Sequence, residues 1–213
     1  MATADTTSVA AQPVVVPVVS PPSVAAPKPP AEPTPWRINV DQYYRMAEAG
    51  IFGPEDRVEL INGAIIRMNP IGNRHADCCD RLNEVLVVTF LKKAKIRVGN
   101  PVRLDEESEP QPDFAILKLR EEPRTEHPGP SETLVAIEVA DSSLRFDRNV
   151  KAPLYATAGI PEFWLVDLNA ETIEVRRKPS KTGYEELQTL RRGDKLACAA
   201  FPDLALDVAE ILG

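Results

Sequence analysis

Two acidic residues lie in or beside short apolar segments of the sequence. Asp113 follows Pro112 and precedes Phe-Ala-Ile-Leu, and Glu138 is the one charge in the apolar run at 134–140. An ionised carboxylate inside an apolar strand is costly to bury, so Glu138 must be paired, protonated or bound to a metal. A plain salt bridge, or a side chain that points out at the open end of a sheet, would also satisfy it.

The two carboxylates together predict a divalent metal site. If their segments are neighbouring strands, Asp113 and Glu138 can meet at one point, and two like charges there need a compensating cation. Mg²⁺ (or Mn²⁺) suits such a pair, because a hard ion takes carboxylate, water and phosphate oxygens as ligands. A metal held there lowers the pKa of a coordinated water and neutralises charge on a phosphate, which favours phosphoester hydrolysis.

A lysine on the helix predicted over 147–158 is the third catalytic candidate. Asp147, Lys151 and Tyr155 recur at a spacing of four, which places them on one helix face. Lys151 could orient the attacking water or stabilise charge, and the electrostatic role is favoured because a lysine beside acidic groups stays charged. A solvated Asp147–Lys151 pair with a half-buried Tyr155 is the alternative. Pro153 removes a backbone hydrogen bond, so the helix either starts late or kinks there.

Three further side chains are candidate contacts. Glu59, in the expected strand Arg-Val-Glu-Leu-Ile, is either a further acidic metal ligand or the partner of a basic residue on a solvated face. His75 opens a long expected helix, and a helix N-terminus suits contact with a phosphate. A capping or surface histidine is the alternative. With Tyr155, His75 is a candidate for substrate contact.

The surrounding pattern predicts an α/β (α+β) fold in which helices flank a central mixed β-sheet. Asn62-Gly63 between apolar runs is a hairpin signal, and the apolar run at 134–140 is typical of a strand buried on both faces. We expect 119–132 to be a surface loop. We expect helices at 40–49, 74–93 and 147–158, and a helical turn at the C-terminal end. The expected strands are 57–61, 64–68, 96–98, 101–104, 112–118, 134–140, 162–168 and 172–178, followed by short strands within 183–206.

Composition limits the function classes. The 213 residues carry a formal net charge of −7, which argues against a broad basic face for nucleic acid but leaves room for a small metal-dependent site. Cys78, Cys79 and Cys198 have neither a disulfide pattern nor a CxxC zinc spacing, so we expect idle thiols in a reducing compartment. No apolar run approaches the roughly 20 residues of a membrane span, and no signal peptide is evident. We therefore expect a cytoplasmic protein without membrane contact.

The first 35 residues differ from the rest. They contain nine of the 21 prolines and no glycine. Such density favours extended polyproline conformations, so we expect 1–35 to be a disordered, semi-stiff tail and 36–213 to be the folded domain. The tail is either passive or contacts a protein partner that reads such segments.

Several segments resemble one known family. They are VELINGAIIRMNP, Arg74-His75, QPDFAIL, LVAIEVADSS and DRNVKAPLYATAGIPEFWLVDL, within about 36–210. In these the chain is similar to the Uma2 family, also called DUF820, of restriction endonucleases in the PD-(D/E)xK superfamily. The resemblance implies a restriction-endonuclease-like core with a divalent metal at the edge of the sheet.

The resemblance also assigns roles to residues. Asp113 matches the motif aspartate, Glu138 the motif acid and Glu59 an early acidic position. The superfamily motif has a lysine two residues after the acid, but this chain has Ala140 there. The resemblance implies that Lys151, on the following helix, takes its place.

Three functions remain as hypotheses. The first is a Mg²⁺-dependent endonuclease that hydrolyses DNA phosphodiester bonds, for which a homodimer would suit cleavage of two strands by analogy of fold. The second is a catalytically silent nuclease-fold module for binding or regulation, which the acidic charge and the missing Lys at position 140 motivate. The third is a metal-dependent hydrolase of a smaller phosphoester.

Overall fold

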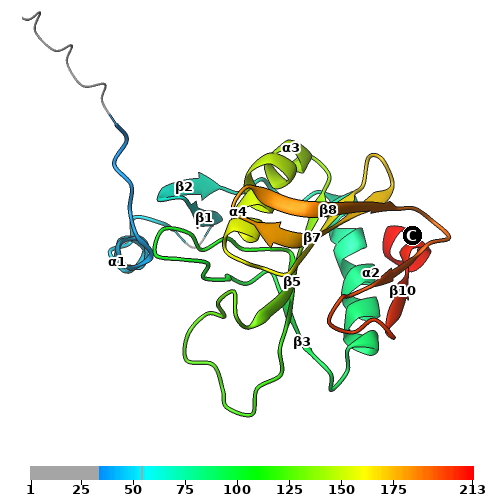
Figure 1. The fold of residues 1–213 in the computed structure, drawn as a ribbon. Coiled ribbons are helices and arrows are strands. Elements are labelled where there is room, and N and C mark those ends of the chain that lie inside the picture. The colour runs from blue at the N-terminus through cyan, green and yellow to red at the C-terminus, as the bar shows by residue number, and fades with distance from the viewer. Residues whose placement is uncertain (1–33, 54) are drawn as a thin grey trace, which may run out of the picture. The chain divides into compact units, whose positions relative to one another are not determined.

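A six-stranded mixed sheet forms the centre of the protein (Figure 1). The computed structural model describes residues 34–53 and 55–213, so the expected tail at 1–35 lies almost wholly outside the described residues. In the sheet, β5 and β6 are parallel and all other neighbours are antiparallel. The strands, in spatial order, are β3 (Lys95–Val98), β4 (Phe114–Leu117), β5 (Thr133–Ala140), β6 (Glu162–Asp167), β7 (Thr172–Ser180) and β8 (Gly183–Leu190).

Helices and two small hairpins surround this sheet, which confirms the predicted mixed fold class. The helices are α1 (Val40–Glu48), α2 (Asn73–Thr89), α3 (Leu144–Phe146), the π-helical turn η1 (Asp147–Lys151), α4 (Ala152–Thr157) and α5 (Val208–Leu212). The hairpins pair β1 (Val58–Ile61) with β2 (Ala64–Arg67), and β9 (Lys195–Ala197) with β10 (Ala205–Asp207). In Figure 1, α2 and α5 lie together on the right of the sheet, and α3 and α4 lie on its upper left.

Strand β5 is buried on both faces, as its apolar run predicts. Its alternate residues Ile137 and Val139 pack in one core cluster with Leu82 and Leu86 of α2. The alternating residues in between and beside them point to the other face, where Ala136 belongs to a second cluster with residues of α4 and β6. Because side chains alternate along a strand, Glu138 shares this second face.

The turn between β1 and β2 is the one that Asn62-Gly63 predicts. Both residues have positive φ, 49° at Asn62 and 72° at Gly63. A side chain at Gly63 would also place its Cβ 2.6 Å from the Cβ of Arg37, so only glycine fits there. The hairpin is joined to the rest of the domain by a hydrogen bond of 2.8 Å from the Glu109 N–H to the Leu60 carbonyl. This attachment brings Glu59 toward the sheet.

The crossover from β5 to β6 contains a π-helical turn. The helix begins at Leu144, three residues earlier than predicted, and η1 widens it before Pro153. The Ala152 N–H donates to the Asp147 carbonyl, five residues back. The helix thus accommodates Pro153 with one wider turn just before the proline. Such π-helical turns are frequent at functional sites.

One predicted strand and one predicted helix end are also wrong. Residues 101–104 form no strand, because the Leu104 N–H donates to the Ser108 carbonyl and closes a local loop instead of joining the sheet. The helix predicted over 74–93 ends at Thr89, and Lys92 has a φ of 59°, which a helix cannot contain. Within the described ranges, no helix combines the length and apolarity that crossing a bilayer requires.

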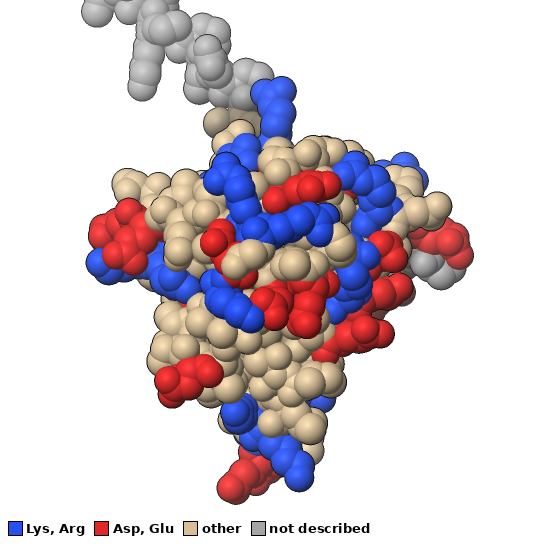
Figure 2. All heavy atoms as spheres, turned by 90° about the vertical axis from the view of Figure 1, so that its right-hand side faces the viewer, with Lys and Arg blue, Asp and Glu red and all other residues tan. Residues whose placement is uncertain are grey.

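Figure 2 shows the face of the domain that carries α2 and α5. Lys and Arg side chains are interspersed there with Asp and Glu side chains, and no unbroken basic band crosses this face. This pattern agrees with the net charge of −7.

The packing of α2 on the sheet predicts a large effect of Leu86→Ala. Leu86 is fully buried in the cluster with Ile137 and Val139, so its truncation leaves a cavity and should lower the free energy of unfolding by about 2 to 5 kcal/mol. Urea denaturation measures this. Val88→Ala on the same helix is the control, because Val88 is 76% exposed and should change stability by only about 0.5 kcal/mol. Equal losses in the two variants would contradict the assigned orientation of α2.

Candidate active site

A polar pocket lies where β4 begins and β5 ends. Its volume is about 480 Å³. Its walls come from the β1–β2 hairpin and the loop that follows it, the first turn of α2, the start of β4, the segment after β5 and the helical crossover. Glu59, His75, Asp113, Asp147 and Lys151 all line it, so five of the ionisable residues that the sequence singles out share one cavity.

Asp113 and Glu138 lie across from each other on β4 and β5. The last paired residues there are Phe114 and Ile137 in antiparallel register, and one further step places Asp113 opposite Glu138. The Oδ2 atom of Asp113 accepts the Val139 N–H at 2.7 Å, which ties its carboxylate to β5. The Asp113 side chain is 22% exposed and lines the pocket, whereas Glu138 is buried and does not line it.

Lys151 lies between two buried carboxylates. Its Nζ is 3.1 Å from Glu138 Oε1 and 3.1 Å from Glu59 Oε2. The Tyr155 hydroxyl also donates to Glu138 Oε1, at 2.8 Å, and the Gln111 N–H donates to Glu59 Oε2 at 3.0 Å. We call Glu59, Lys151 and Glu138 the buried triad. The wide turn η1 carries Lys151 into it, and the β1–β2 hairpin contributes Glu59.

Burial and charge act in opposite directions on the buried triad. Burial raises the pKa of Glu138 well above its usual value, although the attraction of Lys151 opposes the rise. Burial alone would lower the pKa of Lys151, but the attraction of Glu138, Glu59 and Asp147 raises it overall. Lys151 therefore remains an ammonium group at neutral pH. In this form it can stabilise negative charge.

Asp147 and Tyr155 are both buried, so the alternative of a solvated helix face does not hold. Tyr155 is fully buried and lies outside the pocket lining, where its hydroxyl orients Glu138. Asp147 accepts a hydrogen bond from the Ser143 hydroxyl. Burial raises the pKa of Asp147 to about 6, against the opposing effects of Ser143 and Lys151. Lys151 is bonded to the triad carboxylates rather than to Asp147.

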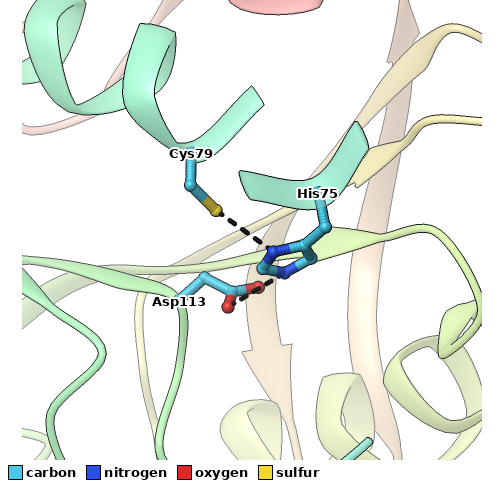
Figure 3. Close-up of side chains that lie close together, drawn as sticks. All are labelled: His75, Cys79 and Asp113. Atoms are coloured by element: carbon cyan, nitrogen blue, oxygen red, sulfur yellow. Dashed lines mark hydrogen bonds and ion pairs between the residues drawn. The ribbon is translucent and has the colours of Figure 1, made fainter. Parts of the chain in front are cut away.

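His75 projects from the first turn of α2 and contacts Asp113 (Figure 3). Its Nε2 is 3.2 Å from Asp113 Oδ1, and its Nδ1 is 3.6 Å from Cys79 Sγ. The hydrogen bond with Asp113 raises the pKa of His75, although burial opposes the rise. Cys79 is a site residue that the sequence reasoning missed. The signal was available, because His75 and Cys79 are four apart on one helix and so share a face.

Three arginines give the pocket a basic rim that the sequence reasoning also missed. Arg57, Arg67 and Arg145 line the pocket and are exposed. Among residues 34–53 and 55–213, no ion pair engages their guanidinium groups. They come from three separate segments, so no local spacing could reveal them. The pocket thus combines an acidic floor with cationic groups at its edge.

Comparison with known proteins places this site in a family. The sequence model of the Uma2 family, described as "Putative restriction endonuclease", matches residues 40–209. The chain belongs to the Uma2 family. The predicted resemblance is thereby confirmed, and the pocket lies within the matched region. A search of curated proteins gave no match.

A solved structure has the same fold. It is a crystal structure from Anabaena variabilis ATCC 29413, described as a putative nuclease belonging to DUF820, with a TM-score of 0.64. The match covers 82% of this chain and 97% of the other, at 17% sequence identity. Identity at this level supports the shared fold only. The roles of individual side chains in this Uma2 protein must therefore be argued from their geometry.

The buried triad predicts a pH-dependent effect of Lys151→Met. Removal of the ammonium leaves Glu59 and Glu138 buried without their shared cation, so the free energy of unfolding at about pH 8 should fall by about 3 to 5 kcal/mol. The loss should shrink toward about pH 5. Glu138, whose pKa burial already raises, would take up a proton there and lose its unpaired charge.

Urea denaturation at both pH values measures these losses. The double variant Lys151→Met/Glu138→Gln serves as the control, because it has one buried carboxylate fewer and should regain at least half of the loss at the higher pH. A loss that is the same at both pH values would show that the triad carboxylates do not carry the effect.

Proposed function

We propose that this protein is a Mg²⁺-dependent endonuclease that hydrolyses phosphodiester bonds of DNA. The observation that carries the proposal is the placement of Asp113 at the pocket surface, next to the β4–β5 pair, with Glu138 on the neighbouring strand bound to a cationic Lys151. The family description and the nuclease fold support phosphodiester hydrolysis in general. Mg²⁺ dependence and DNA as the substrate are inferences from the site.

The donor set fits a hard divalent ion. Asp113, Glu138 and Glu59 offer carboxylate oxygens, and carboxylate oxygen is the ligand type that Mg²⁺ and Mn²⁺ prefer. Asp113 and Glu59 line the pocket, and Glu138 is buried on the neighbouring strand β5. A bound ion would supply charge neutralisation and a more acidic water. Glu59 and Glu138 share one ammonium, and the nearby Asp113 adds a further carboxylate to the pocket, which favours a second cation.

The protein's own groups orient the carboxylates and the phosphate. The Val139 N–H fixes one oxygen of Asp113, and the Tyr155 hydroxyl fixes Glu138. Lys151 stabilises the charge that develops on the phosphate, the electrostatic role that its raised pKa allows. Catalysis by Asp113, Glu138 and Lys151 is therefore part of the proposal.

Phosphate binding would use the rim of the pocket. The first turn of α2 carries His75 and unpaired backbone N–H groups toward the cavity, a common arrangement for anions. Arg57, Arg67 and Arg145 add three guanidinium groups that can pair with phosphate oxygens. This small basic rim is compatible with a net charge of −7, because DNA would be contacted near the cut and not over a broad face. A homodimer and a cytoplasmic location stay predictions.

Cleavage assays test the proposed reaction directly. Wild-type protein should cut DNA when Mg²⁺ or Mn²⁺ is present, and Asp113→Asn or Glu138→Gln should lower the rate by about 100-fold or more, because each removes a negative ligand. Asp203→Asn is the matched control, since Asp203 is exposed and outside the pocket. Thermal unfolding verifies that each variant is folded.

Two outcomes would count against the nuclease. Cleavage that survives Asp113→Asn would show that this pocket is not its source. A protein that cuts no DNA but binds it with unchanged affinity in Asp113→Asn would instead favour the silent nuclease-fold module.

The arginine rim predicts a change in the salt dependence of DNA binding. In the Asp113→Asn background, Arg67→Ala should weaken binding equally for unrelated DNA sequences, because a phosphate contact carries no sequence information. It should also reduce the slope of log affinity against log salt by about 1. Lys181→Ala is the control, since Lys181 is exposed but does not line the pocket. Equal slopes for the two variants would contradict a phosphate contact at Arg67.

A further inference from the structure

His75, Cys79 and Asp113 converge at the edge of the pocket. One ligand atom from each lies within 4.8 Å of the other two. Figure 3 shows His75 and Cys79 pointing from α2 toward Asp113, which precedes β4. Imidazole nitrogen, thiol sulfur and carboxylate oxygen are three ligand types that Mg²⁺ sites do not normally combine. These three side chains therefore suit a different kind of ion from the one that the carboxylates of the buried triad suit.

The separation of Cys79 and His75 matches that of two ligands around a tetrahedral ion. Zinc–sulfur bonds of about 2.3 Å and zinc–nitrogen bonds of about 2.05 Å place sulfur and nitrogen roughly 3.6 Å apart at a tetrahedral angle. Cys79 Sγ and His75 Nδ1 are 3.6 Å apart without any ion. Asp113 lies on the opposite side of the ring, where its Oδ1 is 3.2 Å from Nε2.

We propose that His75, Cys79 and Asp113 form a binding site for a borderline transition-metal ion, with Zn²⁺ as the best fit. Cys79 and one imidazole nitrogen are the primary ligands, and Asp113 completes the set or holds the ring through its other nitrogen. Cys79 as thiolate and Asp113 as carboxylate balance the charge of a divalent ion. His75 and Asp113 line the pocket, so a water can take a remaining coordination position.

The neighbouring cysteine has a different role. Cys78 is fully buried in the core, where its thiol donates to the Ile211 carbonyl. Cys79 is only partly buried and faces His75. Burial raises the pKa of the Cys79 thiol, so the metal-free protein carries a proton there that the ion displaces on binding. Cys79 is thus the proposed ligand, and the adjacent Cys78 is its matched control.

Occupation of this site would regulate the proposed nuclease, and this step rests on the proposed function. Asp113 belongs both to this group and to the carboxylates proposed for Mg²⁺. An ion on His75 and Cys79 that engages Asp113 withdraws that carboxylate from the Mg²⁺ set. Zn²⁺ should therefore inhibit Mg²⁺-dependent cleavage.

Cobalt spectroscopy on the purified full chain tests the site without reference to activity. Co²⁺ should give a thiolate-to-metal charge-transfer band that Zn²⁺ abolishes by displacement. Cys79→Ser should lose the band, and calorimetry should show Zn²⁺ affinity at least about 10-fold lower in Cys79→Ser and His75→Gln. Cys78→Ser should keep both signals. Thermal unfolding without metal verifies that each variant is folded. No band in the wild type, or a band that persists in Cys79→Ser, would overturn the site.

Inhibition is measured separately. Zn²⁺ should suppress Mg²⁺-dependent DNA cleavage by the wild type and by Cys78→Ser, and much less by Cys79→Ser. Equal suppression in Cys79→Ser would overturn the link between the two sites. If the wild type cuts no DNA at all, the nuclease proposal and the inhibition fail together, whereas the cobalt band still decides the metal site.

Discussion

The ion pairs of Lys151 with two buried carboxylates are the constraint on which this part of the fold depends. Three segments distant in sequence supply Glu59, Glu138 and Lys151, and each side chain is at most 5% exposed. A charge buried to this degree is tolerated only when its partners are in place, so the hairpin, the central strand and the crossover must all adopt their final positions together. The pocket forms where these segments meet. Its geometry is therefore tied to the stability of the domain.

The helical crossover between β5 and β6 is the segment that brings Lys151 to these carboxylates. Pro153 cannot donate a backbone hydrogen bond, and a regular helix through this segment would leave a carbonyl without a partner. Just before this proline the Ala152 N–H bonds to the Asp147 carbonyl five residues back, and Lys151 of the same wide turn is buried. The widened turn is thus compatible with a proline that would otherwise interrupt the helix. It also carries the ammonium that reaches Glu138, at 3.1 Å from its Oε1 atom.

How much the sequence predicts depends on whether the signal is local. The run around Glu138 identified the central strand, and Asn62-Gly63 identified the hairpin, because strand periodicity and positive φ are properties of neighbouring residues. The opposition of Asp113 and Glu138 needed only the assumption that their strands are adjacent. The pairing of Lys151 with Glu59 could not be predicted in this way, since it depends on how the hairpin docks through Glu109 and Gln111.

Other features were missed for related reasons. Val102 and Leu104 have the alternation of a strand, but their backbone groups bond within a local loop, and alternation cannot distinguish the two. The arginine rim is assembled from remote segments. Cys79 had a local signal in its spacing of four from His75, but spacing between cysteines, the usual sign of a zinc site, does not reveal a pair made of a cysteine and a histidine.

Asp113 is the residue at which the two proposed metal chemistries meet. On one side are oxygen ligands around a fixed ammonium, which suit a hard ion and a phosphate. On the other are an imidazole and a thiol, which suit a softer ion. The Val139 N–H holds one oxygen of Asp113 and His75 contacts the other, so its carboxylate is shared between a strand and a helix. Both oxygens of Asp113 thus already have a partner, and an ion that takes Asp113 as a ligand must compete with the Val139 N–H or with His75 for one of them.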